Sequence, residues 1–72
     1  MKQSLIDLRK KAGLSRYALA VKIDATPQSI VNWENGEAKP NIDSVHNLAK
    51  VFGVTMDDIF LSLPTTKAVK NS

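Results

Sequence analysis

Apolar residues recur along this chain at intervals of three and four positions, with polar residues between them. This spacing is the period of a helix that buries one face, and no stretch shows the alternation typical of a strand. We therefore predict an all-α fold, a compact bundle of about five short helices around one core. The predicted helices span residues 1–12, 15–23, 26–35 and 41–52, and Thr55 caps a short last helix.

Residues with capping preferences mark the ends of these helices. Ser15, Thr26 and Thr55 carry side-chain oxygens that can accept hydrogen bonds from the first backbone N–H groups of a helix. Pro27 suits a first helical position, where a missing N–H costs nothing. Glycine, which readily adopts the left-handed conformation that ends helices, follows the first, third and fourth predicted helices at positions 13, 36 and 53.

Two of the predicted helices place large side chains in the core. The apolar face of the fourth helix consists of Ile42, Val45, Leu48, Ala49 and Phe52. In the last helix, we expect Ile59, Phe60 and Leu61 to pack inward. Asp57 and Asp58 fall in the first turn of that helix, where the helix dipole favours acidic groups, so we interpret them as helix-stabilising and not as catalytic.

Residues 15–36 are the most informative stretch, because two short helical patterns meet there at a tight turn. Ala20 is small at the position where the two helices would cross, and a larger side chain would push them apart. The apolar positions that would face the core are Leu19, Ile23, Ala25, Ile30 and Trp33. A helix-turn-helix unit of this kind holds its second helix in the major groove of DNA.

Several short motifs extend this pattern over roughly residues 5–60, and Trp-Glu-Asn-Gly at the end of the second helix of the unit is a specific one. The others are Leu8-Arg9, Gly13-Leu14-Ser15, Leu19-Ala20, Ile23, Ser29-Ile30, Pro40, Leu48-Ala49-Lys50, Gly53-Val54 and Asp58-Ile59-Phe60. In these residues the chain resembles the Cro/C1-type, or XRE-like, helix-turn-helix proteins of phages and bacteria. The resemblance implies a lambda-repressor-like DNA-binding domain that regulates transcription.

Three positions depart from the usual pattern of that family. Asp24 stands where glycine is frequent after the first helix of the unit, but Asp tolerates a left-handed conformation better than most residues. Arg16 replaces the usual Gln at the start of that helix, so a charged phosphate donor takes the place of a neutral one. Val31 replaces a polar residue and could contact a thymine methyl group.

The resemblance also implies that residues near the start of the second helix touch base edges. The matching positions are Pro27, Gln28, Val31 and Asn32. Gln28 is the principal candidate, because its amide can bond both N6 and N7 of adenine, and Asn32 could do the same or reach a phosphate. Pro27 cannot read a base by hydrogen bonds, so we expect it only to pack on the groove wall.

Phosphate contacts are expected from both ends of the unit. Ser15 and Arg16 stand at a helix N-terminus, where backbone N–H groups suit an anion. Contacts of this kind position a protein on DNA without reading its sequence. The complete set of phosphate-binding candidates is Ser15, Arg16, Tyr17, Ser29, Asn35 and Lys39.

Arg9 and Glu34 are the candidates for a structural ion pair. In the family, these positions join the first helix to the end of the recognition helix. A bidentate pair there would fix the angle at which the recognition helix is presented to DNA.

Composition narrows the chemistry further. The 72 residues suffice for one small domain, and the net charge of +3 favours a polyanionic partner without demanding one. The chain contains no Cys, and its one histidine, His46, lacks the companions that a metal site requires. It also contains no nucleophile elbow and no phosphate-binding glycine loop. We therefore expect no enzymatic activity, cofactor, metal or small-molecule ligand.

The leading prediction is a sequence-specific double-stranded DNA-binding transcriptional regulator, a phage or bacterial repressor that reads operator major grooves with helix 26–35. It would bind a pseudo-palindromic operator as a homodimer, at least on DNA. By analogy with the family, the dimer surface would lie in the C-terminal part, around Val54, Met56, Leu61 and Leu63.

The alternative prediction is an antitoxin or protein-interaction module of the same fold, with Tyr17, Val21 and Val31 as its partner surface. In either case, we expect the helix-turn-helix domain over residues 1–63 and a flexible tail over 64–72. No membrane-spanning run or signal-peptide pattern is present, so the expected location is the cytoplasm. A complete Cro-like protein and the DNA-binding domain of a longer repressor both fit the sequence.

Overall fold

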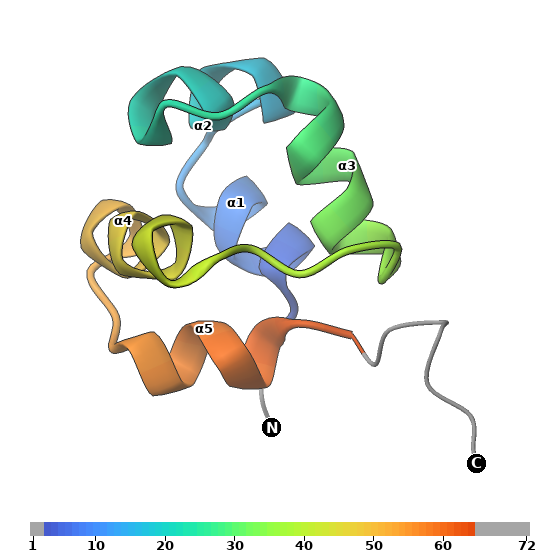
Figure 1. Cartoon of the computed structure of the whole chain (residues 1–72). Coiled ribbons are helices and arrows are strands. Elements are labelled where there is room, and N and C mark those ends of the chain that lie inside the picture. Colours follow the sequence, from blue (N-terminus) through green and yellow to red (C-terminus); the bar gives the residue numbers. More distant parts are fainter. Residues whose placement is uncertain (1–2, 65–72) are drawn as a thin grey trace, which may run out of the picture.

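The computed structural model of the chain describes residues 3–64. Over this range the protein consists of helices joined by short loops, and the all-α prediction is confirmed. In Figure 1, α2 lies at the top of the molecule and α5 at the bottom, with α1 and α4 between them. The tail predicted over residues 64–72 lies, apart from Pro64, outside the described residues. The helices are α1 (Leu5–Lys11), α2 (Arg16–Ile23), α3 (Pro27–Asn35), α4 (Ile42–Phe52) and α5 (Met56–Ser62).

One hydrophobic core unites the five helices. Helix α2 packs against α3 and α4, and α4 packs against α5. Burying a large aliphatic side chain contributes about 1.5–3 kcal/mol, so this core supplies the main force that fixes the helices relative to one another. Trp33 is buried, as predicted, and Ala25 is half-buried against the core. The buried apolar residues are Leu5, Leu8, Leu19, Ala20, Ile23, Ile30, Trp33, Val45, Leu48, Ala49 and Ile59.

Side-chain caps begin the helices at the predicted places for α2, α3 and α5. Ser15 Oγ accepts the N–H of Ala18 at 3.0 Å, and Thr26 Oγ1 accepts the N–H of Ser29 at 3.1 Å. Thr55 forms a reciprocal capping box with the residue three positions later. Each cap satisfies a backbone donor that has no partner within its helix, so these three helix starts are fixed locally.

The first helix begins later than the prediction over residues 1–12. Ser4 is extended and caps the helix: its Oγ accepts the Asp7 N–H at 3.1 Å, while Asp7 Oδ2 accepts the Ser4 N–H at 3.2 Å. This capping box starts α1 at Leu5. The Ser-x-x-Asp pattern at residues 4–7 is the sequence signal that apolar spacing alone overlooks.

The structure also corrects three predicted core positions. Ile42 is 62% exposed, because it is the first residue of α4 and follows the exposed cap Asn41 at the surface. Phe60 and Leu61 are exposed by 49% and 56%. They lie about 100° and 200° around the helix from Ile59, and α5 turns only the face of Ile59 toward the core.

Candidate DNA-binding site

The turn between α2 and α3 determines how α3 is presented. Asp24 adopts the left-handed conformation, with φ 59° and ψ 45°, as its tolerance for that region predicts. The N–H of Ala25 then donates to the carbonyl of Ala20 at 2.8 Å. Ala20 itself is buried, which lets the two helices approach closely. The turn and the core together fix the angle between α2 and α3.

Helix α3 separates buried from accessible residues. Ile30, Trp33 and Glu34 face the interior. Among the four base-reading candidates, Pro27 and Gln28 are exposed, whereas Val31 and Asn32 are half-buried. The amide of Gln28 donates from Nε2 to Oδ1 of Asn32 at 3.0 Å, so the two polar candidates contact each other one turn apart.

The phosphate candidates are accessible in the described chain, although several already have protein partners. Tyr17 is 69% exposed, and Asn35 and Lys39 are exposed at and beyond the end of α3. Ser29 is half-buried, and its hydroxyl pairs with that of Thr26 at 3.0 Å. Ser15 Oγ already accepts a hydrogen bond as the cap of α2, so the remaining role of Ser15 is its position at the helix N-terminus.

A buried carboxylate joins three helices beneath this surface. Arg9 Nε donates to Oε2 of Glu34 at 2.7 Å, so the structure contains the predicted pair, but through a single bond and not in the bidentate form. Arg9 also donates from Nη1 to the carbonyl oxygen of Leu14 at 3.0 Å. The Glu34 side chain is 0% exposed and that of Arg9 is 9% exposed. The pair therefore ties α1 to the end of α3 in a largely buried site.

The sequence prediction missed a second partner of the same carboxylate. Arg16 Nε donates to Oε1 of Glu34 at 2.8 Å, and the Arg16 side chain is 48% exposed. Arg16 thus joins Arg9 and Glu34 in a structural ion network, and it is also a phosphate candidate. The sequence contained one signal for this contact. Position 16, at the start of α2, is basic where the family usually has Gln, and position 34 is acidic.

Other polar groups in the described residues do not form a competing site. His46 is exposed, and within residues 3–64 no group of His, Asp and Glu side chains could hold a metal ion. Asp58 Oδ2 accepts the backbone N–H of Thr55 at 3.2 Å, so it acts as a helix cap. None of the helices in this part of the chain is both long and apolar enough to cross a membrane.

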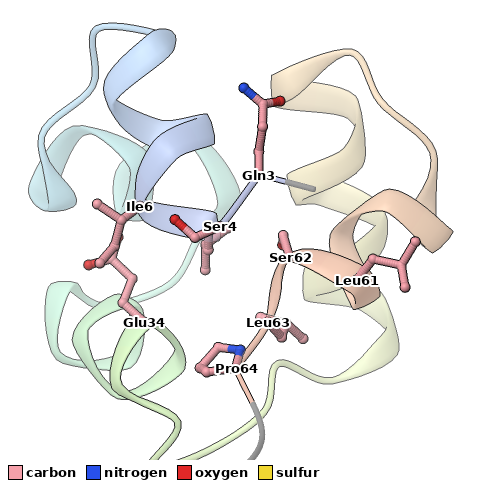
Figure 2. A pocket seen from close by; sticks show the side chains of 9 residues that line it. Gln3, Ser4, Ile6, Glu34, Leu61, Ser62, Leu63 and Pro64 are labelled. Atoms are coloured by element: carbon pink, nitrogen blue, oxygen red, sulfur yellow. The ribbon is translucent and has the colours of Figure 1, made fainter. Parts of the chain in front are cut away.

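A hollow of about 280 Å³ lies between the start of α1, the side chain of Glu34 and the end of α5, as Figure 2 shows. None of the predicted DNA-contacting residues lines it. Leu61 and Leu63, two residues of the predicted dimer surface, are among its lining residues.

The four residues of the predicted dimer surface differ in their exposure. Val54, Met56 and Leu63 are half-buried and pack against the core, so each keeps only part of its surface accessible. Of the four predicted residues, only Leu61 is largely exposed, and its neighbour Phe60 joins it at the surface.

Comparison with known proteins agrees with the geometry. The model of the family described as Helix-turn-helix matches residues 5–59. The 26 kDa repressor protein of Escherichia phage HK022 is 43% identical over 49 residues, which are 62% of this chain and 21% of that protein. The HTH-type transcriptional activator BcrR of Enterococcus faecalis is 32% identical over 57 residues, 79% of this chain and 28% of that protein.

A shorter relative matches along nearly its whole length. An uncharacterized HTH-type transcriptional regulator of Methanocaldococcus jannaschii is 34% identical over 61 residues, 85% of this chain and 92% of that protein. No solved structure matches the chain significantly. With the family model covering most of the five-helix fold, the chain belongs to the Cro/C1-type helix-turn-helix family of DNA-binding transcriptional regulators, a family without enzymatic activity.

Proposed function

We propose that this protein is a sequence-specific repressor that acts in the cytoplasm and binds a pseudo-palindromic operator in double-stranded DNA. The N-terminal half of α3 enters the major groove, where Gln28 reads a base edge and Val31 contacts an apolar group such as a thymine methyl. Pro27 packs on the groove wall. Repression is steric, because the bound protein occupies DNA that polymerase or a competing regulator would use.

The exposed amide of Gln28 on a rigidly held helix is the observation that carries this proposal. Gln28 lies one position after Pro27, at the accessible start of α3. The left-handed turn at Asp24, the Thr26 cap and buried Ile30 hold that start in place. Specific recognition requires such rigidity, since a bidentate contact to a base depends on the position of two atoms at once.

Backbone contacts support the same docking. Arg16 uses Nε to bind Glu34, and among the described residues no partner occupies its two Nη groups, which remain available for a phosphate. Ser15 and Tyr17 flank it at the start of α2, while Ser29, Asn35 and Lys39 belong to α3 and the loop after it. These residues would position α3 in the groove without selecting a sequence.

Two copies of the chain bind successive major grooves on one face of the duplex, about 34 Å apart. The exposed side chains of Phe60 and Leu61 supply an apolar contact for the second copy. Leu63 and Pro64, which line the hollow beside them, extend this surface. Because one copy offers only a small apolar patch, dimerisation is expected chiefly on DNA, where both copies are already neighbours.

Fluorescence anisotropy with the full chain tests this function. Labelled duplexes from the region upstream of its own gene are compared with scrambled duplexes across a salt series. Tight binding to one fragment, well above the scrambled control and weakening steeply with salt, is the expected result. Weak and equal binding to both would contradict it and favour a protein partner on Tyr17 and Val21. Transcription in vitro from the bound fragment then distinguishes repression, which we expect, from activation.

A further inference from the structure

The two amides on the accessible surface of α3 are not independent. Nε2 of Gln28 donates a hydrogen bond to Oδ1 of Asn32 at 3.0 Å. The residues are four positions apart, so their side chains are neighbours on the helix surface. The Asn32 side chain leans toward the N-terminus of α3, over the turn that carries Gln28. Asn32 thereby restricts the orientation of the Gln28 amide before any partner arrives.

We infer that Asn32 is a positioning residue that holds the Gln28 amide ready for adenine, and not a second adenine reader. The inference rests on the proposed function, since it concerns how the α3 surface selects a base pair. Its physical basis is the division of donors and acceptors that the hydrogen bond imposes on the two amides.

The Gln28 amide has two N–H donors and one carbonyl acceptor. One donor is used by Asn32, which leaves one donor and the carbonyl. Adenine in the major groove asks for that combination, with N7 as acceptor and N6 as donor. The hydrogen bond therefore consumes only the part of Gln28 that a bidentate adenine contact does not need.

Asn32 keeps more free donors than free acceptors. One of the two lone pairs of its carbonyl accepts from Gln28, whereas both N–H groups of its amide remain donors. A group that mainly donates suits the acceptors of guanine, thymine or a phosphate better than adenine, which also needs an acceptor for its N6. Asn32 is also half-buried, in contrast to the exposed Gln28. The sequence alone allowed two adenine-reading amides, and the geometry gives them different roles.

Holding one side chain in its bound orientation reduces the entropy lost on binding. For a side chain with several rotatable bonds, this effect corresponds to a change in affinity of about 2- to 10-fold. No other residue in the described range supplies a hydrogen bond to the Gln28 side chain. The neighbouring Ser29 pairs with Thr26, and Arg16 is held by Glu34. Loss of the Asn32 side chain should therefore reduce discrimination at the base pair that Gln28 reads.

The test uses the full chain and a pool of randomised duplexes of about 30 base pairs, which span roughly three helical turns. The most enriched duplex and its single base-pair variants are then titrated with wild type, Gln28→Ala, Asn32→Ala and the double variant. Gln3→Ala serves as the control, because it removes an exposed amide outside the candidate site. Melting temperatures verify that each variant folds.

We expect Gln28→Ala and Asn32→Ala to relax the preference at the same A·T base pair. Asn32→Ala lowers discrimination there by about 2- to 10-fold, but changes it less than 2-fold when Gln28 is already Ala. Asn32→Asp retains an acceptor for Gln28, so it keeps the preference while its charge weakens binding to all duplexes alike.

Two results would overturn the inference. If Asn32→Ala relaxes a different base pair, or if the two single effects add in the double variant, Asn32 reads a base on its own. Either result leaves the proposed function intact, because sequence preference itself remains. A pool in which no sequence is enriched would instead reject sequence-specific binding, and the positioning role with it.

Discussion

Arg16 and Glu34 are joined at 2.8 Å between Nε and Oε1, across the two helices of the DNA-binding unit. The other oxygen of the same carboxylate accepts from Arg9 at 2.7 Å. The Glu34 side chain is completely buried, so both of its oxygens are satisfied by protein donors. One anion therefore links α1, α2 and α3, and through Arg16 it links the scaffold to a proposed phosphate contact.

Removal of that anion should destabilise the fold strongly. Breaking a buried ion pair by deleting one partner costs about 3–5 kcal/mol, because the remaining charge stays buried. Glu34→Gln leaves Arg9, whose side chain is 9% exposed, in this situation. We therefore expect its free energy of unfolding to fall by about 3–5 kcal/mol in a urea titration followed by circular dichroism.

The matched control is Asp43→Asn, which makes the same chemical change at an exposed position in the first turn of α4. It should cost less than about 1 kcal/mol, the usual contribution of an acid near a helix N-terminus. Equal losses in the two variants would show that the Glu34 network contributes nothing special to stability.

Arg16→Ala should separate DNA binding from folding. The Arg16 side chain is half exposed, and without it Glu34 keeps its bond to Arg9, so the variant should lose less stability than Glu34→Gln and remain folded. Its affinity should fall on specific and scrambled duplexes alike, and the slope of log K against log salt should decrease by about one. Lys50→Ala removes an exposed cation from the last turn of α4 and should leave the slope unchanged. A wild-type slope for Arg16→Ala would mean that Arg16 touches no phosphate.

Ala20→Leu should disturb the crossing of α2 and α3. Ala20 is 1% exposed, so added methylenes must displace neighbouring side chains or move the helices apart. Overpacking of this kind costs about 1–3 kcal/mol. Thermal unfolding measures the loss, and an anisotropy titration should show weakened operator binding at a temperature where the variant is folded. Ala18→Leu is the control on the same helix, at a half-buried position outside the core, and should cost less. A larger loss for Ala18→Leu would contradict close packing at Ala20.

Leu61→Lys should weaken assembly without affecting the fold. Leu61 is 56% exposed, and surface substitutions usually change stability by less than about 0.5 kcal/mol. In sedimentation experiments with an operator duplex, wild type should form a complex of two copies, whereas Leu61→Lys should shift it toward one. Ile42→Lys introduces the same charge at an exposed apolar site on α4 and should behave as wild type. Two copies bound by Leu61→Lys would place the dimer contact elsewhere.

Local chemistry predicted the starts of α2, α3 and α5, but not that of α1. Thr26 and Thr55 cap the helices that their positions indicated, and Asp24 adopts the left-handed turn that its side chain tolerates. The orientation of α5 could not be predicted in this way. Ile59, Phe60 and Leu61 are consecutive and all apolar, so only the packing of α5 against α4 decides that Ile59 alone is buried.

The candidate site shows the same division. The resemblance pointed to Arg9 and Glu34, but the role of Arg16 depends on how closely α2 approaches α3, which no local pattern specifies. Gln28 and Asn32 are four positions apart in sequence, yet the direction of their hydrogen bond follows from side-chain geometry. Their contacts with DNA, like those of the phosphate candidates, remain predictions.

The separation of buried and accessible positions within α3 has a consequence for how this protein can change. Ile30, Trp33 and Glu34 hold the helix, whereas Pro27 and Gln28 take no part in the core. Substitutions at these two accessible positions can therefore alter the preferred operator at little cost in folding free energy. A library randomised at positions 27 and 28 would consist largely of folded proteins, which makes this small domain a practical scaffold for redirecting DNA recognition.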